Sequence, residues 1–218
     1  MLDRGKWPES IRPNTPRAEV VDIRSDTPTA ADTFLVDTNV WFWLTYTRAS
    51  LANRPPRLYQ ATDYPAYMNS ALNVQSKLYW CGLSLPELAH SIEKTEREVF
   101  ARTPGFDNTT NKQFRHNYPI ERTKVVAEVQ TAWTQVKNIA SPIGVAVDEA
   151  NTDAALGRFQ TDPVDGYDLF ILEAISKAGI VQVITDDGDF STIPAIRVFT
   201  SNRNVITTAT RKGKILCR

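Results

Sequence analysis

Residues 34–44 read FLVDTNVWFWL, and the character of this stretch changes in its middle. The first three residues are apolar, as in a buried strand, and the residues from Val40 onward are apolar like the start of a buried helix. Asp37, Thr38 and Asn39 stand between the two parts. All three residue types cap helices well, so the stretch predicts a strand that turns directly into a helix. A carboxylate held in a fixed place would use the same position, and the stretch alone leaves both interpretations open.

The same change from strand to helix recurs along the chain. A strand over 80–85 leads into a helix that starts at Pro86 and runs to about Arg102. Near the other end, Asp168 opens a helix that Gly179 closes, and the apolar strand IVQVIT follows. Further helices are expected over 64–79, 119–140 and 149–159, and further strands over 143–147 and 196–200. Alternating apolar strands and amphipathic helices predict an α/β fold, a three-layer α/β/α sandwich around a mainly parallel sheet.

The two ends of the chain differ from this central part. Residues 1–31 contain four prolines among scattered charges and are expected to form an extended arm. Residues 32–200 form the predicted domain, in which 48–63 read as a loop or lid and 104–118 show no periodicity. Residues 201–218 hold five Lys and Arg and no acid, which favours a solvated basic tail over a phosphate-contacting one.

Composition excludes several classes of protein. The 25 Lys and Arg balance the 25 Asp and Glu, so a nucleic acid would have to meet a local basic patch rather than an overall positive field. Two cysteines are too few and too poorly spaced for a disulfide framework or a zinc site. The N-terminus lacks the apolar centre of a signal peptide, and no apolar run approaches the roughly 20 residues that span a bilayer. A soluble cytoplasmic protein without a membrane segment is expected.

Several carboxylates follow the predicted strands. Asp37, Glu87 and the acids of the turn TDDGDF each come just after a strand, and Asp168 begins a helix on the same edge of the sheet. Each alone has a local explanation as a helix cap, a macrodipole partner or a turn residue. Together they lie where open parallel sheets bind ligands. Clustered carboxylates repel one another unless a cation neutralises them, and oxygen-only ligands favour Mg²⁺ or Mn²⁺.

The segments VDTNV, LPEL, DGYDLFILEA and VITDDGDF together resemble the PIN domain, a fold of metal-dependent ribonucleases. Many bacterial members of that family are the toxin component of a type II toxin–antitoxin pair. The resemblance covers about residues 33–200. It implies a set of catalytic and metal-binding acids, which are Asp37, Glu87, Asp168 and Asp187.

The resemblance also assigns supporting positions around these acids. Small polar residues that would hydrogen-bond around the cluster are Thr38, Asn39 and Thr185. Within the last motif Asp186 and Asp189 stay open as alternatives to Asp187, and Asp165 competes with Asp168 but precedes a glycine.

The activity that the resemblance implies is endoribonucleolytic hydrolysis of RNA phosphodiester bonds with Mg²⁺ or Mn²⁺. RNA would bind through its backbone, with Arg48, Arg54 and Arg57 as candidate contacts. A protein antitoxin and a second copy of the chain are the partners that such a toxin implies.

Two other functions are consistent with parts of the pattern. An aspartate after the first strand also begins haloacid-dehalogenase-like phosphatases, but these need a second acid two residues later, where this chain has Asn39. A catalytically silent PIN-like module that only binds RNA is the other alternative. The presence of all four family acids argues against it.

Overall fold

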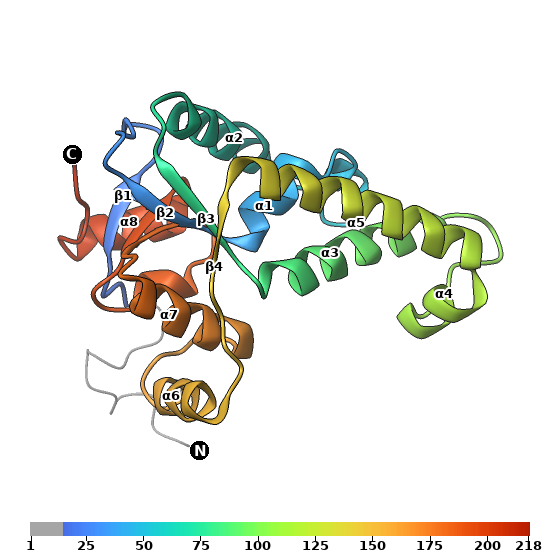
Figure 1. Ribbon diagram of the computed structural model, residues 1–218. Coiled ribbons are helices and arrows are strands. Elements are labelled where there is room, and N and C mark those ends of the chain that lie inside the picture. Colours follow the sequence, from blue (N-terminus) through green and yellow to red (C-terminus); the bar gives the residue numbers. More distant parts are fainter. Residues whose placement is uncertain (1–14) are drawn as a thin grey trace, which may run out of the picture.

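The computed structural model describes residues 15–218, which form a single parallel sheet between two layers of helices (Figure 1). The six strands lie in the order β1-β6-β5-β2-β3-β4, and every pair is parallel. Their bounds are β1 Glu19–Asp22, β2 Thr33–Val36, β3 Lys77–Cys81, β4 Ser141–Ile143, β5 Gln182–Ile184 and β6 Arg197–Thr200. The predicted α/β class and three-layer sandwich are therefore confirmed.

Helices cover both faces of the sheet. They are α1 Thr38–Thr45, α2 Leu58–Asn73, α3 Ser84–Phe100, α4 Asn111–Asn117, α5 Pro119–Ile139, α6 Glu149–Phe159, α7 Gly166–Ala178 and α8 Arg203–Arg211, with short 3₁₀ turns at Ala49–Leu51 and Asp189–Thr192. Alternation along β2 shows how the layers form. Phe34 and Val36 join the core with α1, α2 and α5, while Leu35 joins the core with α6, α7 and α8. Within residues 15–218, no helix combines the length and the apolar character needed to cross a bilayer.

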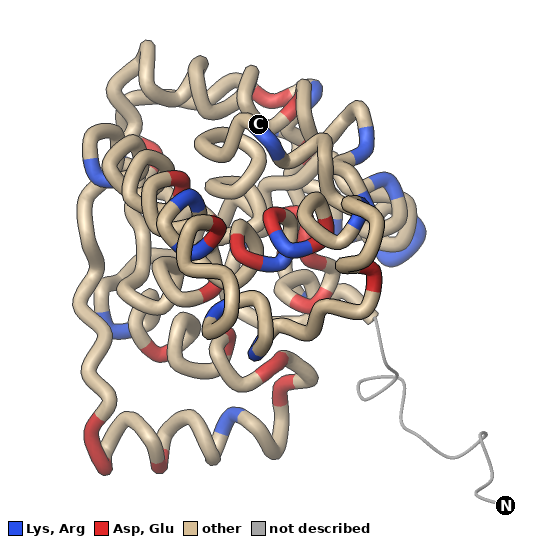
Figure 2. Tube along the Cα trace, turned by 90° about the vertical axis from the view of Figure 1, so that its right-hand side faces the viewer, with Lys and Arg blue, Asp and Glu red and all other residues tan. Residues whose placement is uncertain are grey.

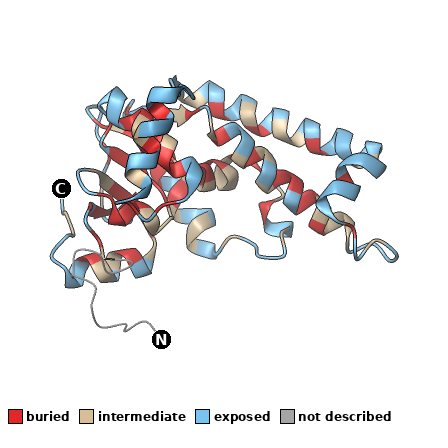
Figure 3. Cartoon of the chain, turned by 90° about the horizontal axis from the view of Figure 1, so that it is seen from below, coloured by how far each residue is buried: buried red, intermediate tan, exposed pale blue. Residues whose placement is uncertain are grey.

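Three helices form an extension from the side of the sheet. In Figure 1, α3 and α5 run beside each other away from the strands, and α4 lies at their far end. We call residues 84–139 the helical extension. Its tip is held by packed aromatic rings, with Phe100 within 4.7 Å of Tyr118 and 5.6 Å of Phe114 between ring centroids. Figure 3 shows that buried positions of the extension lie between its helices and exposed ones on the outside.

Both ends of the described chain belong to the fold, which differs from the expected arm and tail. Residues 19–22 form the edge strand β1 beside β6, since Val20 and Val21 bury completely on opposite faces. The basic C-terminal stretch forms α8, and Ile215 bridges Val20. Four residues without a clear periodicity give too short a signal for a strand, so only the pairing with β6 defines it. The first part of the expected arm, residues 1–14, lies outside the described residues.

Element boundaries also differ in several places. The helix expected over 64–79 ends at Asn73, and residues 77–79 belong to β3 instead. The strand expected over 143–147 is β4, Ser141–Ile143. Helix α2 starts at Leu58, inside the expected loop 48–63, where the Arg57 N–H donates to Gln60 Oε1 at 2.8 Å. The predicted strand 80–85 ends at Cys81, and α3 begins at Ser84 with Pro86 in its first turn. The stretch 104–118 contains α4. These segments are polar or lie at the surface, so their sequence carries little periodic signal.

Arg218 binds two buried carboxylates in the stretch of chain that joins β1 to β2. Its guanidinium pairs with Asp26 at 2.8 Å and Asp32 at 2.5 Å and lies over the Phe199 ring. Burial alone would raise the pKa of Asp32, but hydrogen bonds from Arg218 and Gln182 lower it to about 2. Because Asp26 and Asp32 have side chains only 2% and 6% exposed, the fold depends on this counter-charge.

We expect Arg218→Ala to lower the free energy of unfolding by about 3 kcal/mol at pH 7, because two buried carboxylates lose their counter-charge and keep only neutral donors such as Tyr67 and Gln182. Urea unfolding measures this, with the exposed Arg211→Ala as control, expected within about 0.5 kcal/mol of the parent. A depressed pKa stabilises the folded state above the unfolded value, and this is lost as the pH falls from about 4 to 2. The difference between variant and parent should shrink over that window, and equal stability at pH 7 would contradict the prediction.

Candidate metal centre

The predicted acids meet at the carboxyl edge of the sheet. Strands β2 and β5 are neighbours, and the chain leaves β2 towards β3 on one side and returns through β5 on the other. Ligand sites of open parallel sheets lie at such a switch point. The two strand ends are joined directly, since the Asp37 N–H donates to the Ile184 carbonyl at 3.0 Å.

A cleft of about 940 Å³ opens at this edge. It runs from the strand ends along the helical extension, between α3 and α5. Five carboxylates line its inner end, namely Asp37, Glu87, Asp165, Asp168 and Asp187. The structure thus brings together the four acids that the sequence assigned to the site, with Asp165 beside them.

Asp37 is both a helix cap and a member of the cluster. Its Oδ1 accepts the Thr38 N–H at 2.6 Å, which caps α1. Its Oδ2 accepts hydrogen bonds from Thr185 Oγ1 at 2.5 Å and from Asn39 Nδ2 at 2.7 Å. Thr185 Oγ1 in turn accepts the Asp187 N–H at 2.9 Å. The two interpretations of this position are therefore compatible, and the predicted supporting residues hold the Asp37 carboxylate in one orientation.

Glu87 is positioned by the residue after Asp37. Thr38 Oγ1 donates to Glu87 Oε2 at 2.5 Å, which links the first turn of α1 to the first turn of α3. Burial raises the pKa of Glu87, the Thr38 hydrogen bond opposes this, and the nearby charges of Asp165 and Asp187 raise it further.

The cap of α7 differs from the expectation. Helix α7 begins at Gly166, and Asp165 caps it by accepting the N–H groups of Tyr167 at 3.0 Å and Asp168 at 3.2 Å. Asp168 therefore lies inside the first turn rather than opening the helix. Because Asp165 supplies the cap, Asp168 is left to face the cleft, where its residue is only 8% exposed.

The three acids of the turn TDDGDF have different surroundings and contacts. The Asp186 carboxylate accepts hydrogen bonds from Gln60 Nε2 at 2.6 Å and Tyr64 Oη at 2.7 Å, so it fastens α2 to the sheet. Asp189 begins the 3₁₀ turn and does not line the cleft. Asp187 does line it, and this geometry favours Asp187 over its two neighbours.

Crowding of these carboxylates changes their acidity. Burial raises the pKa of Asp37 to about 7, helped by Asp187 and Glu87 and opposed by the Thr185 hydrogen bond. Burial and the negative charges of Asp37, Asp165, Asp187 and Glu87 raise the pKa of Asp168 to about 9. A cation would relieve this repulsion and favour the charged forms.

The donor chemistry of the site fits a hard divalent ion. The carboxylates at the inner end of the cleft offer only oxygen donors, the type that Mg²⁺ and Mn²⁺ prefer. The buried Asn39 Oδ1 has no hydrogen-bond partner among residues 15–218, which leaves one more unsatisfied oxygen beside Asp37. In the same residues, no three Asp, Glu, His or Cys side chains stand together in a ready metal-binding arrangement.

Basic residues lie elsewhere than the sequence suggested. Arg48 pairs with Glu96 at 3.1 Å, and neither Arg54 nor Arg57 lines the cleft. Arg115 and Arg122 line its outer end, and the sequence did not predict them there. The available signal was slight: Arg115 lies in the stretch 104–118, which shows no periodicity, and Arg122 lies in the first turn of the helix expected over 119–140.

Comparisons with known proteins add little to this site. No family model matches the chain, and no curated protein matches it. Among solved structures it is similar to the crystal structure of FitAcB from Neisseria gonorrhoeae, with 17% identity over 78% of this chain and 99% of that chain. The TM-score of this likeness is 0.38, which is too low to bear on function.

Proposed function

We propose that this protein is a metal-dependent endoribonuclease that hydrolyses RNA phosphodiester bonds with Mg²⁺ or Mn²⁺. The observation that carries the proposal is the convergence of Asp37, Glu87, Asp168 and Asp187 in one cleft at the switch point of a parallel sheet. The PIN-like motifs in the sequence support the same activity.

The four carboxylates would hold the divalent ion. Held there, such an ion would supply Lewis-acid chemistry for hydrolysis of a phosphodiester, including a lower pKa for a water molecule. The chain itself orients the ligands: Thr185 and Asn39 fix Asp37, and Thr38 fixes Glu87. Asp37 and Asp168 have raised pKa values and must lose protons to serve as ligands, so ion binding should release protons.

The contacts of Asn39 argue against a phosphatase of the haloacid-dehalogenase type. That chemistry needs an acid two residues after the nucleophilic aspartate, to protonate the leaving group. Here the position holds an amide that donates to Asp37 at 2.7 Å and cannot supply a proton in that way.

Purified protein and a 5′-labelled single-stranded RNA provide the test. Cleavage is expected in Mg²⁺ or Mn²⁺ and not in EDTA. Binding of RNA with no cleavage in either metal, for RNAs of several sequences, would instead support a catalytically silent RNA-binding module.

The PIN resemblance extends the proposal to a toxin that a protein antitoxin neutralises, and to a homodimer. Growth arrest on expression, relieved by co-expression of a small protein encoded beside this gene, tests the first extension. Analytical ultracentrifugation of the purified chain tests the second.

A further inference from the structure

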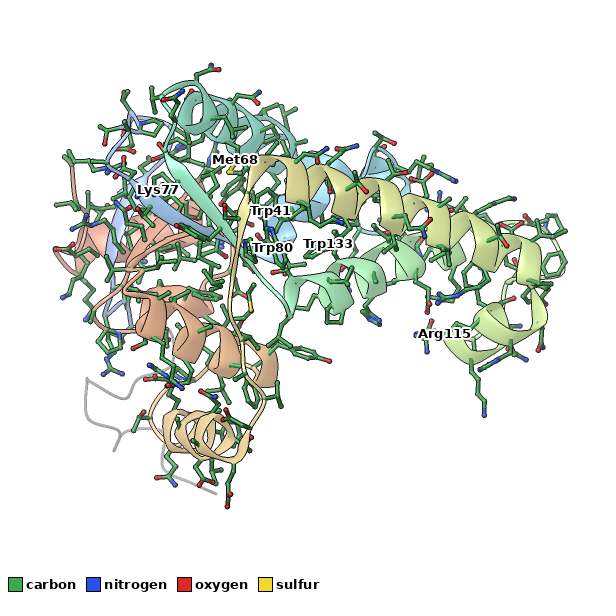
Figure 4. All side chains as sticks on the ribbon, viewed as in Figure 1. Trp41, Met68, Lys77, Trp80, Arg115 and Trp133 are labelled. Atoms are coloured by element: carbon green, nitrogen blue, oxygen red, sulfur yellow. The ribbon has the colours of Figure 1, made fainter. Side chains whose placement is uncertain are left out.

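Two arginines meet at the outer end of the acidic cleft. Arg115 of α4 donates through Nε to Glu93 Oε1 at 2.5 Å, and Arg122 of α5 donates through Nη1 to Glu93 Oε2 at 2.9 Å. Glu93 belongs to α3 and is buried, so one carboxylate joins all three helices of the extension. Figure 4 shows Arg115 at the tip of the extension, between α4 and α3.

This arrangement leaves positive charge in excess and free donors. Two guanidinium groups share a single carboxylate, so the group of three carries a net charge of about +1. Each guanidinium has five N–H donors, and its bond to Glu93 occupies few of them. The Arg115 and Arg122 side chains remain 45% and 46% exposed, so the other donors are accessible. Because Glu93 fixes both side chains, little conformational entropy is lost when they bind an anion.

The arginines and the acids border the same cleft at opposite ends. Glu87 and Glu93 are six residues apart on α3, which corresponds to a rise of about 9 Å. At a spacing of at least roughly 3.4 Å per phosphate along a strand, this separation spans about one to three nucleotides. Figure 2, which views the molecule from the side of the extension, shows acidic and basic positions interleaved there.

The wall between the two ends suits the rest of a nucleotide. It presents apolar side chains from α5, including Val125, Val126 and Val129, and the polar side chains of His90 and Gln130. Apolar surface packs against sugars and bases, and the polar groups can hydrogen-bond to base edges. Such contacts need bases that are not paired in a duplex. A single strand is therefore the form of nucleic acid that the cleft fits.

We propose that Arg115 and Arg122, oriented by Glu93, bind the backbone phosphate of single-stranded RNA one to three nucleotides from the bond at the acidic end. This inference rests on the proposed function, for which it names substrate-binding residues. Backbone contacts of this kind position the strand and carry no sequence information. The helical extension then serves to hold RNA across the site rather than to choose its sequence.

Fluorescence anisotropy with a labelled single-stranded RNA of twelve nucleotides, in EDTA, tests the inference without cleavage. Arg115→Gln/Arg122→Gln should raise the Kd about 10-fold or more at low salt. The slope of log K against log salt should fall by about 0.7 for each phosphate that the variant no longer neutralises. The single variants leave one guanidinium on Glu93, which protects the fold, and each should show an intermediate Kd.

Lys77→Gln/Lys137→Gln is the matched control, because it also removes two exposed positive charges, neither of which lines the cleft. Its Kd should stay within about 2-fold of the parent. An unchanged Kd in both single variants and the double variant would overturn the inference, even if the protein cleaves RNA. Conversely, arginine-dependent binding with no cleavage in any metal would support it while contradicting the proposed ribonuclease, so the two failures are distinguishable.

Discussion

Replacing Asp37 with asparagine is expected to lower metal-dependent RNA cleavage by about 100-fold or more, as loss of one preorganised electrostatic group does in other enzymes. The shape of the side chain is kept, and an amide oxygen in place of Oδ2 still accepts from Thr185 and Asn39. The amide nitrogen in place of Oδ1 no longer accepts the Thr38 N–H, so one cap bond of α1 is lost. The negative charge is lost, however, and a neutral amide is a poor ligand for a hard divalent ion. Single-turnover cleavage of labelled RNA in Mg²⁺ measures the effect.

Three further variants separate loss of a metal ligand from loss of any carboxylate. Asp153→Asn removes an exposed carboxylate of α6 outside the cleft and should keep the parent's rate. Asp187→Asn should lower the cleavage rate as much as Asp37→Asn does. Asp189→Asn should retain at least about half of the activity, because Asp187 lines the cleft and Asp189 does not. Full activity in Asp37→Asn would remove the central argument for the proposed metal site, because cleavage would then not depend on Asp37.

Strong periodic signals in the sequence were sufficient for the central fold. The stretch FLVDTNVWFWL predicted a strand followed at once by a helix, and the structure has β2 and α1 there with Asp37 as the cap. The helix expected over 119–140 is α5, Pro119–Ile139. Such segments are predictable because burial on one face imposes a period on the sequence.

The convergence of the acids was also predictable, because it follows from topology. Parallel strands place their carboxyl ends on one edge, so residues just after each strand meet whatever their separation along the chain. The residue that caps α7 was harder to predict from the sequence. Asp165 and Asp168 are both suitable caps, and only the backbone geometry, with Asp165 in extended conformation, assigns the cap to one and the cleft to the other.

The arginine pair could not be read from the sequence. Glu93, Arg115 and Arg122 come from three different helices and meet only because α4 folds back at the tip of the extension. The aromatic contacts that place α4, such as Phe100 against Phe114, join the end of α3 to the stretch 104–118, which shows no periodicity. The edge strand β1 was equally hard to predict, because its pairing with β6 joins residues far apart in the sequence.

Stability should depend on pH in a way that reports on the acidic cluster. The pKa of Asp37 rises from 3.8 to about 7, and that of Asp168 from 3.8 to about 9. Between about pH 4 and pH 9 the folded protein binds more protons than the unfolded chain. The free energy of unfolding of the metal-free protein therefore falls as the pH rises through this range. At pH 8 the Tm of the metal-free protein should lie at least about 5 °C below its value at pH 5.

Divalent ions should reverse this loss. A ligand that binds only the folded state stabilises it, and these carboxylates bind an ion only when deprotonated. Millimolar Mg²⁺ or Mn²⁺ should therefore raise the Tm at pH 8 and have little effect at pH 5.

Asp168→Asn should flatten the dependence of the metal-free Tm on pH, because it removes the charge whose burial costs most. It should also weaken the response of the Tm to the ion. Thermal unfolding in EDTA and in metal, from pH 5 to pH 9, measures both effects. A parent protein whose Tm rises with pH in EDTA, or responds equally to metal at both ends, would show that these carboxylates are not held together. The repulsion that destabilises the empty cluster is also what a cation would relieve, so a substitution such as Asp168→Asn that stabilises the metal-free protein at pH 8 should weaken ion binding.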